Sequence, residues 1–175
     1  MYRAEAVEAL IEPVLGSLRA GAGHDILHFA VHGRFDAADS EDGINMTDGT
    51  YLSRHSVRGI ETSPVRLVFL NACQLGQGRS VLGSNAGMVP AFLGLGVGAA
   101  IAPLWNVDDQ VAKEFAEGFY RAALESGAAP AEYVRQQRAA TRGAAGADLS
   151  TPLAYLFFGH PRLTIEWDPE GADGA

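Results

Sequence analysis

The stretch "VRLVFLNAC", residues 65–73, is the strongest indication of the fold class. Its branched and aromatic residues form an almost unbroken apolar run, which is typical of a strand buried in a parallel sheet. The run ends at Cys73, the only cysteine in the chain, and a glycine-rich segment follows. Because open α/β sheets bind their ligands beyond the carboxyl ends of the strands, this position predicts a functional thiol.

Strands and helices alternate on both sides of this stretch. Three more apolar runs predict strands, "ILHFAVHG" at 26–33, "VGAAIAPLW" at 97–105 and "PLAYLFFG" at 152–159. Periodic or capped stretches predict helices at residues 4–18, 53–60, 87–96, 108–127 and 130–143. "GINMTDGTYLS" predicts a hairpin that turns at Asp48 and Gly49. Strands separated by helices indicate an α/β fold, with a parallel sheet covered by helices on both faces.

Length, charge and composition limit the class of protein. A chain of 175 residues is long enough for one domain, which we expect over residues 1–165, followed by a mobile tail at 166–175. The net charge of -8 argues against a nucleic-acid partner. No apolar run reaches the roughly 20 residues of a membrane span, and acidic residues in "MYRAEAVEALIEPVL" argue against a signal peptide. A single cysteine permits no internal disulfide, so we expect a cytoplasmic location.

The first strand supplies histidines that could act on the thiol. His28 and His32 lie an even number of residues apart, so both should point to the same face of the sheet. His32 is the last residue before Gly33, and Cys73 ends the next long strand. If the two strands are parallel neighbours, His32 and Cys73 emerge at the same edge, about 4.8 Å apart in strand spacing. An imidazole at that distance can serve as the acid and base for a thiolate.

Backbone donors meet at the same edge. The N–H groups of Gly33 and Cys73 could hold a developing oxyanion, and a glycine lets a substrate carbonyl approach the backbone closely. A thiolate, an imidazole and oxyanion donors are the requirements of acyl transfer.

These residues also carry a family resemblance. "ILHFAVHG" followed by "LVFLNACQLG" resembles the histidine and cysteine boxes of CHAT domains, which are caspase-like domains of the caspase and separase group of cysteine peptidases. The resemblance extends over about residues 25–165 and implies a caspase-like three-layer sandwich with a mostly parallel sheet. It also implies that Cys73 is the nucleophile, His32 the general acid and base, and Gly33 an oxyanion donor. Asn71 and the spacing from Cys73 to Gly76 depart from the caspase signature and favour the CHAT branch.

The resulting hypothesis is a cysteine endopeptidase that hydrolyses a protein or peptide substrate through a thioester on Cys73, with no cofactor. Relatives are often joined to sensor or repeat domains, so a regulatory protein or a fused sensor region is expected. Residues 74–87 are rich in glycine, so we expect this loop to be mobile and the isolated domain to be a poor peptidase until a partner orders it. A catalytically inactive interaction module and a thiol acyltransferase are the alternative hypotheses.

Several residues have a second interpretation. Cys73 could be a buried core thiol, and His28 fits a core histidine better than a second base. A metal pair of His28 and His32 lacks further ligands, so no metal site is expected. The glycines at 94, 96 and 98 precede a strand, whereas phosphate-binding loops follow one, so they indicate close packing.

Two carboxylates follow the third predicted strand. One of Asp108 and Asp109 should cap the next helix. In related peptidases an acidic pocket selects a basic residue before the cut bond, so either carboxylate could instead bind substrate. Trp105 follows the same strand, and a place in the core is favoured over one at the site.

Overall fold

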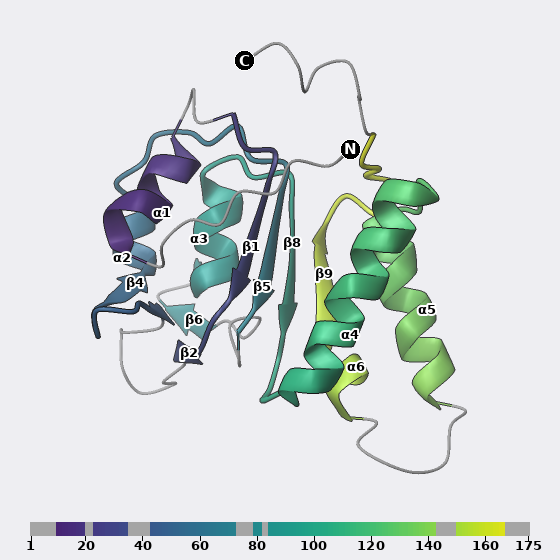
Figure 1. Cartoon of the computed structure of the whole chain (residues 1–175). Helices are drawn as coiled ribbons and strands as arrows, with labels where there is room; N and C mark the ends of the chain where they lie inside the picture. Colours follow the sequence, from purple (N-terminus) through teal and green to yellow (C-terminus); the bar gives the residue numbers. More distant parts are fainter. Residues whose placement is uncertain are drawn as a thin grey trace.

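The computed structural model describes residues 10–19, 23–34, 43–72, 79–81, 84–142 and 150–166. Its centre is a four-stranded sheet in the order β1-β5-β8-β9 (Figure 1). The strands are β1 (Ile26–Ala30), β5 (Leu67–Asn71), β8 (Ala99–Pro103) and β9 (Tyr155–Gly159). β1, β5 and β8 are parallel neighbours, whereas β9 runs antiparallel to β8. The mostly parallel α/β sheet predicted from the sequence is therefore confirmed.

Helices cover both faces of the sheet, which makes the fold a three-layer sandwich. One face carries α1 (Ile11–Leu18), α2 (Arg54–Val57) and α3 (Met88–Gly94). The other carries α4 (Asp109–Tyr120), the π-helix η1 (Arg121–Glu125), α5 (Pro130–Arg142) and α6 (Ser150–Ala154) (Figure 1). Alternate residues of the strands enter two separate cores, as at Val68 on the first face and Phe69 on the second.

The antiparallel direction of β9 follows from the opposite directions of α4 and α5, which precede it in the chain. α4 and α5 run in opposite directions beside the sheet (Figure 1), so the chain is back at the carboxyl edge of β8 when α5 ends. It enters β9 from that edge, where Tyr155 pairs with Pro103. The predicted strand at 152–159 is shorter than expected, because its first residues belong to α6.

The predicted hairpin is confirmed in a small second sheet of β2 (Gly33–Arg34), β3 (Gly43–Asn45) and β4 (Tyr51–Ser53). Asp48 accepts hydrogen bonds from the backbone and hydroxyl of Thr50, and Gly49 has a φ of +82°. A positive φ is unfavourable for residues with a side chain, so Gly49 fits this turn.

The first strand ends earlier than predicted. β1 stops at Ala30, and Gly33 pairs with Ile44 in the small sheet instead of continuing the large one. The backbone N–H of Asn45 donates to the carbonyl of His32 at 2.9 Å. His32 is therefore held in the connection between the two sheets and is not the last residue of the strand.

The other predicted elements differ mainly at their ends. The first helix is described only from Ile11, so the expectation for residues 4–9 lies outside the described residues. The predicted helix at 108–127 is α4 continued by η1, and Gly127 ends it with a φ of +64°. Within the segment expected to be a mobile loop, β6 (Arg79–Val81) and β7 (Ser84–Ala86) form an antiparallel pair. Residues 74–78 and 82–83 of that segment, and Cys73 before it, lie outside the described residues.

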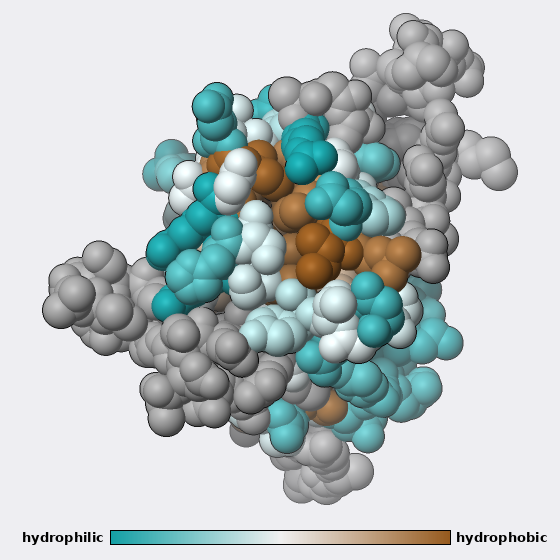
Figure 2. Space-filling model, turned by 90° about the vertical axis from the view of Figure 1, so that its left-hand side faces the viewer, coloured by the Kyte–Doolittle hydropathy of each residue, from teal (hydrophilic) through white to brown (hydrophobic). Residues whose placement is uncertain are grey.

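The surface shows where the fold meets solvent. The face turned to the viewer in Figure 2 is mostly hydrophilic, with hydrophobic side chains gathered near its centre.

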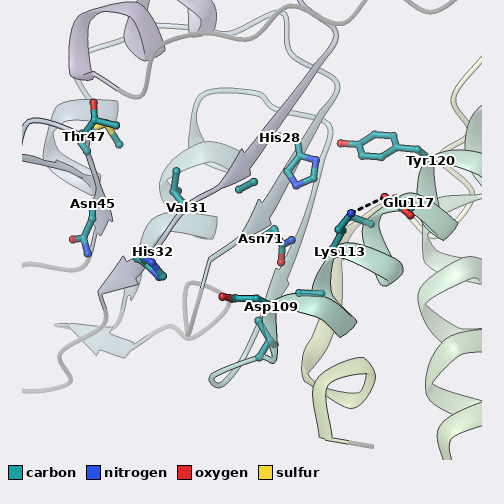
Figure 3. A pocket seen from close by; sticks show the side chains of 15 residues that line it. His28, Val31, His32, Asn45, Thr47, Asn71, Asp109, Lys113, Glu117 and Tyr120 are labelled. Atoms are coloured by element: carbon teal, nitrogen blue, oxygen red, sulfur yellow. Dashed lines mark ion pairs between the residues drawn. The ribbon is translucent and has the colours of Figure 1, made fainter. Parts of the chain in front are cut away.

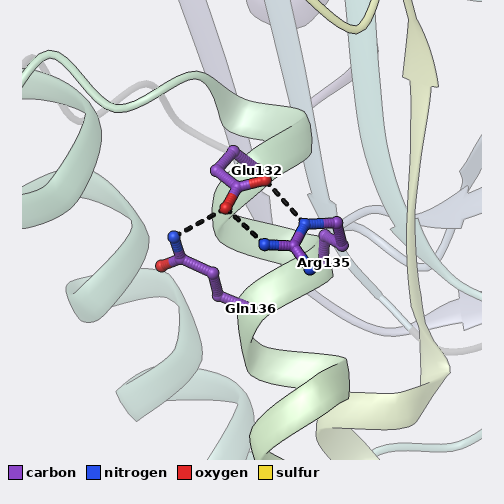
Figure 4. A network of polar contacts seen from close by, with 3 residues as sticks. All are labelled: Glu132, Arg135 and Gln136. Atoms are coloured by element: carbon purple, nitrogen blue, oxygen red, sulfur yellow. Dashed lines mark hydrogen bonds and ion pairs between the residues drawn. The ribbon is translucent and has the colours of Figure 1, made fainter.

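On α5, Glu132 accepts hydrogen bonds from Arg135 and Gln136 (Figure 4). These bonds lower the pKa of Glu132 to about 2, but exposed pairs of this kind add little stability. None of the helices within the described residues is long and apolar enough to cross a membrane.

Candidate active site

The carboxyl ends of β1 and β5 define the candidate site. The two strands are parallel neighbours, with Ala30 opposite Asn71. His32 follows Ala30 by two residues, and Cys73 follows Asn71 by two residues. The prediction that the two strands are neighbours is therefore confirmed. Cys73 lies outside the described residues, so its pairing with His32, and the oxyanion site of Gly33 and Cys73, stay predictions.

An open groove of about 830 Å³ lies between β1 and α4, and His32 is among the residues that line it. We call it the β1–α4 groove. It is lined by residues 28, 30–32, 45–47, 71 and 107, and by the side of α4 that carries Asp109, Lys113, Glu117 and Tyr120 together with the buried Ala112 and Ala116 (Figure 3). The side chain of His32 is exposed and borders this groove. A substrate held in the groove would therefore reach the imidazole.

His28 lies further along the same groove and is not the core residue that the sequence favoured. Its side chain is exposed, and its ring centre lies 4.8 Å from that of Phe69 and 5.6 Å from that of Tyr120. Desolvation by the surrounding protein lowers the pKa of His28 to about 4, while water in the open groove opposes that shift. At neutral pH the imidazole is neutral and can both donate and accept a hydrogen bond.

Tyr120 differs from the other tyrosines on this face. The hydroxyl of Tyr133 donates to the carbonyl of Phe115 at 2.9 Å, and that of Tyr155 donates to Asn71 Oδ1 at 2.5 Å. The hydroxyl of Tyr120 is buried without a hydrogen-bond partner among the described residues, and it points toward His28 (Figure 3). Desolvation raises the pKa of Tyr120, so the hydroxyl stays protonated.

Asn71 of β5 is held in place by a residue of β9, two strands away in the same sheet. Its side-chain oxygen accepts the Tyr155 hydroxyl across β8, because Tyr155 begins β9. Asn71 also lines the β1–α4 groove, two residues before Cys73. The bond therefore fixes the end of β5 from which the thiol-bearing segment starts. Sequence reasoning missed Tyr155, because nothing in the local pattern links two residues so far apart in the chain.

The two neighbouring carboxylates have different surroundings. Asp108 caps α4, since its Oδ1 accepts from the N–H of Val111 at 3.0 Å, and its own N–H donates to Thr151 Oγ1 at 2.9 Å. Asp109 lies in the first turn of the helix and lines the groove. The expectation that one of the two caps the helix is confirmed for Asp108. A role in substrate binding for either residue stays a prediction.

A family model described as the CHAT domain matches residues 3–163 of the chain. The chain belongs to the CHAT-domain family. Its members are caspase-like domains related to peptidases, in agreement with the three-layer sandwich and with the resemblance found in the histidine and cysteine boxes. No curated protein matches the sequence.

The CHAT domain also carries an ion pair that the sequence analysis did not single out. Lys113 and Glu117 lie one helical turn apart on α4, with Nζ and Oε1 separated by 3.8 Å. Both are exposed and line the groove, as Figure 3 shows. Their spacing of four residues is the signal that could have identified the pair.

Trp105 of the CHAT domain does not have the core position that was favoured. It is 38% exposed, the one large hydrophobic residue of the described chain that is this open to solvent. It follows β8, where the backbone turns toward α4, and it is not among the residues that line the groove. The apolar pattern of the strand extended past its true end at Pro103, which explains the wrong expectation.

The remaining expectations concern cofactors and metals. A Cβ atom on Gly98 would lie 2.9 Å from the carbonyl oxygen of Arg66, so the predicted close packing is confirmed at this glycine. The prediction is wrong for Gly94 and Gly96, where a Cβ atom would meet nothing within 4 Å. Within the described residues no group of three or more His, Cys, Asp and Glu side chains could hold a metal ion.

Proposed function

We propose that this CHAT domain is a cysteine endopeptidase that hydrolyses peptide bonds of protein substrates through a thioester on Cys73. The observation that carries the proposal is the parallel pairing of β1 with β5, with Ala30 opposite Asn71. It brings the carboxyl ends of β1 and β5, from which the chain leads to His32 and to Cys73, to the same edge of the sheet, where ligands of such folds bind. The groove that His32 lines supports a polypeptide substrate.

The reaction has two steps. The thiolate of Cys73 attacks the scissile carbonyl, a C–S bond forms, and the N–H groups of Gly33 and Cys73 stabilise the oxyanion. The C–N bond then breaks, and the imidazolium of His32 gives its proton to the leaving amine. In the second step His32 takes a proton from water, the hydroxide attacks the thioester, and the acid product and thiolate are released.

Asp109 gives the proposal its specificity. Its carboxylate is exposed in the groove, whereas the carboxylate of Asp108 accepts the N–H of Val111 as a helix cap. We therefore assign substrate binding to Asp109 and a preference for arginine or lysine before the cut bond. A charge-assisted hydrogen bond to a basic side chain is the expected contact.

Control by a partner belongs to the same proposal. The β6–β7 pair lies in the segment that follows Cys73, so a regulatory protein or sensor region that contacts this pair would act on the thiol-bearing segment. Hydrogen exchange over residues 74–87 should slow when a covalent peptide inhibitor or an activating partner binds. Full protection in the free chain would contradict this form of control.

Covalent labelling tests the activity directly. A peptide that carries a thiol-reactive group should label the protein saturably at Cys73, and Cys73→Ala should abolish both labelling and cleavage. His32→Ala should leave the fold intact by circular dichroism and abolish cleavage. A Cys73→Ala variant that still cuts peptides would overturn the proposal. Absent labelling combined with tight peptide binding would instead support a catalytically inactive interaction module.

A further inference from the structure

The edge strand β1 is open on one side. Within the described residues β1 pairs with β5 and has no neighbour on its other side. An edge strand of this kind presents unpaired backbone N–H and C=O groups that can pair with another strand. His28 and Ala30 are exposed on the same strand, whereas Phe29 is buried and Ile26 and Leu27 are half-buried.

The β1–α4 groove is too long for one substrate side chain. Its lining on α4 runs from Asp109, at the first turn of the helix, to Tyr120 at its last residue. At 1.5 Å per residue that part of the helix is about 16 Å long. An extended chain rises about 3.3 Å per residue, so about five residues would fill the same length. His32 lines the groove, which connects the groove to the proposed site of cleavage.

The groove favours a basic occupant. Asp109 and Glu117 provide two carboxylates against the single ammonium of Lys113, which is already paired with Glu117. The rings of His28 and Tyr120 present aromatic surface at the far end, and aromatic faces attract cations.

We propose that the β1–α4 groove binds an extended, basic segment of the substrate polypeptide, about five residues that flank the cut bond and add to the free edge of β1. This inference rests on the proposed peptidase function. Main-chain pairing would supply affinity and the groove side chains the preference for lysine and arginine. A second copy of the chain is a poorer occupant, because each copy carries a net charge of -8 and would bring further negative charge to an acidic groove.

A length series of peptides tests this inference. The starting probe is a basic tetrapeptide substrate selected by library digestion, and it is lengthened by five residues on either side of the cut bond. The added residues are lysine-rich in one series and glutamate-rich in the other. On one side of the cut bond, extension with lysine-rich residues should raise kcat/KM about tenfold or more at low salt. Extension with glutamate-rich residues should not raise it. The gain should shrink as the ionic strength rises.

Glu117→Lys and Glu114→Lys form a matched pair of variants. Both residues are exposed on α4, but only Glu117 lines the groove. Glu117→Lys should remove most of the gain from basic extension, measured within each variant as the ratio of kcat/KM for the long peptide to that for the tetrapeptide. Glu114→Lys should keep the gain. Equal rates for short and long peptides, or equal losses in both variants, would overturn the inference.

Binding to Cys73→Ala separates the groove from the chemistry. A fluorescent long basic peptide should bind this variant at least tenfold more tightly than the tetrapeptide, and Glu117→Lys in the same background should remove the difference. If no peptide is cleaved and Cys73 is not labelled, the proposed peptidase function is wrong. The binding assay still shows, independently of that result, whether the groove binds a long basic peptide. Dimerisation of the free chain that Glu117→Lys abolishes would assign the groove to a second copy and overturn the inference.

Discussion

The two faces of the central sheet are packed by different side chains. Toward α1, α2 and α3 the core is mainly aliphatic, with Val68 and Leu70 of β5 among Val, Leu, Ile, Met and Ala residues and two phenylalanines. Toward α4 and α5 the core is rich in rings, which are Phe69, Phe115, Phe119, Tyr133 and Tyr155. The groove with His28 and Tyr120 continues this aromatic face.

The difference shows on which face of the sheet the hydroxyl and imidazole groups of the aromatic residues lie. Rings with hydroxyl or imidazole groups are apolar in body and polar at the tip, so they can pack in a core and still present a hydrogen-bonding group. On the α4 face these tips belong to Tyr133, Tyr155, Tyr120 and His28, and the last two line the groove. Apolar packing therefore stabilises both faces, and among the described residues the ring-borne polar groups that the proposed substrate site uses lie on the α4 face.

The two histidines at this face provide the largest expected contrast. His32→Ala should lower kcat/KM by about a thousandfold or more, because it removes the general acid and base. His28→Ala should lower it by no more than about tenfold, since His28 lies away from the strand ends. Steady-state cleavage of a basic peptide measures both. Equal losses of kcat/KM in the two folded variants would show that His32 and His28 do not have separate roles in catalysis and in recognition.

The two cores should contribute similarly to stability despite their different composition. Phe92 on the α3 side and Phe119 on the α4 side are both fully buried, so either change to alanine should lower the free energy of unfolding by about 3–5 kcal/mol. Urea denaturation checks this. If only the α4-side variant is strongly destabilised, the aliphatic face is a minor part of the core.

The hydrophobic patterns predicted the layers well, because each face of a strand must find its own core. The apolar runs predicted the strands β1 and β5, and local turn and capping signals predicted the Asp48 turn and a cap of α4 by Asp108 or Asp109. They could not place the contacts that depend on the assembled sheet. The Tyr155 bond to Asn71 joins residues 84 positions apart, and the early end of β1 results from its link to β3. The groove likewise requires the relative position of β1 and α4, which periodicity does not encode.

The adjacent carboxylates separate stability from recognition. Asp108→Ala should lower the free energy of unfolding by about 1 kcal/mol, since it removes the cap of α4. Asp109→Ala should change stability less and should reduce the preference for basic over neutral peptides by about tenfold. Thermal unfolding and a mixed peptide digest measure the two effects. A wild-type preference for acidic or neutral residues would show that Asp109 does not bind substrate.

Two tyrosine hydroxyls on the α4 face should have effects of opposite sign. Tyr120→Phe removes a buried hydroxyl without a partner among the described residues, so it should stabilise the free protein by about 1 kcal/mol. Tyr133→Phe removes a hydroxyl bonded to Phe115 at 2.9 Å and should destabilise it by a similar amount. The gain from Tyr120→Phe should fall when a long basic peptide is bound, if the peptide reaches the hydroxyl. Destabilisation of the free chain by Tyr120→Phe would show that the Tyr120 hydroxyl forms a hydrogen bond in the folded protein.

The smallest expected effect is a pH dependence that originates at His28. Its pKa is lowered from 6.5 to about 4 in the folded protein, so between these values the unfolded chain binds more protons than the folded one. Stability from this residue is therefore complete above about pH 6.5 and is lost as the pH falls toward 4. Water reaches the exposed ring through the groove, so the measured loss should be well below that of a fully buried histidine.

His28→Gln tests this assignment, because glutamine stays neutral throughout the range. Urea unfolding at pH 7 and pH 4.5 should show a smaller loss of stability in His28→Gln than in the wild type. His55→Gln, at an exposed histidine on α2 beside the other face of the sheet, is the matched control for loss of one imidazole. An identical pH dependence in His28→Gln and the wild type would show that the groove leaves His28 as well hydrated as the unfolded chain does. The aromatic face would then be distinguished from the aliphatic one by its packing alone, and not by the protonation of the residue that faces Tyr120.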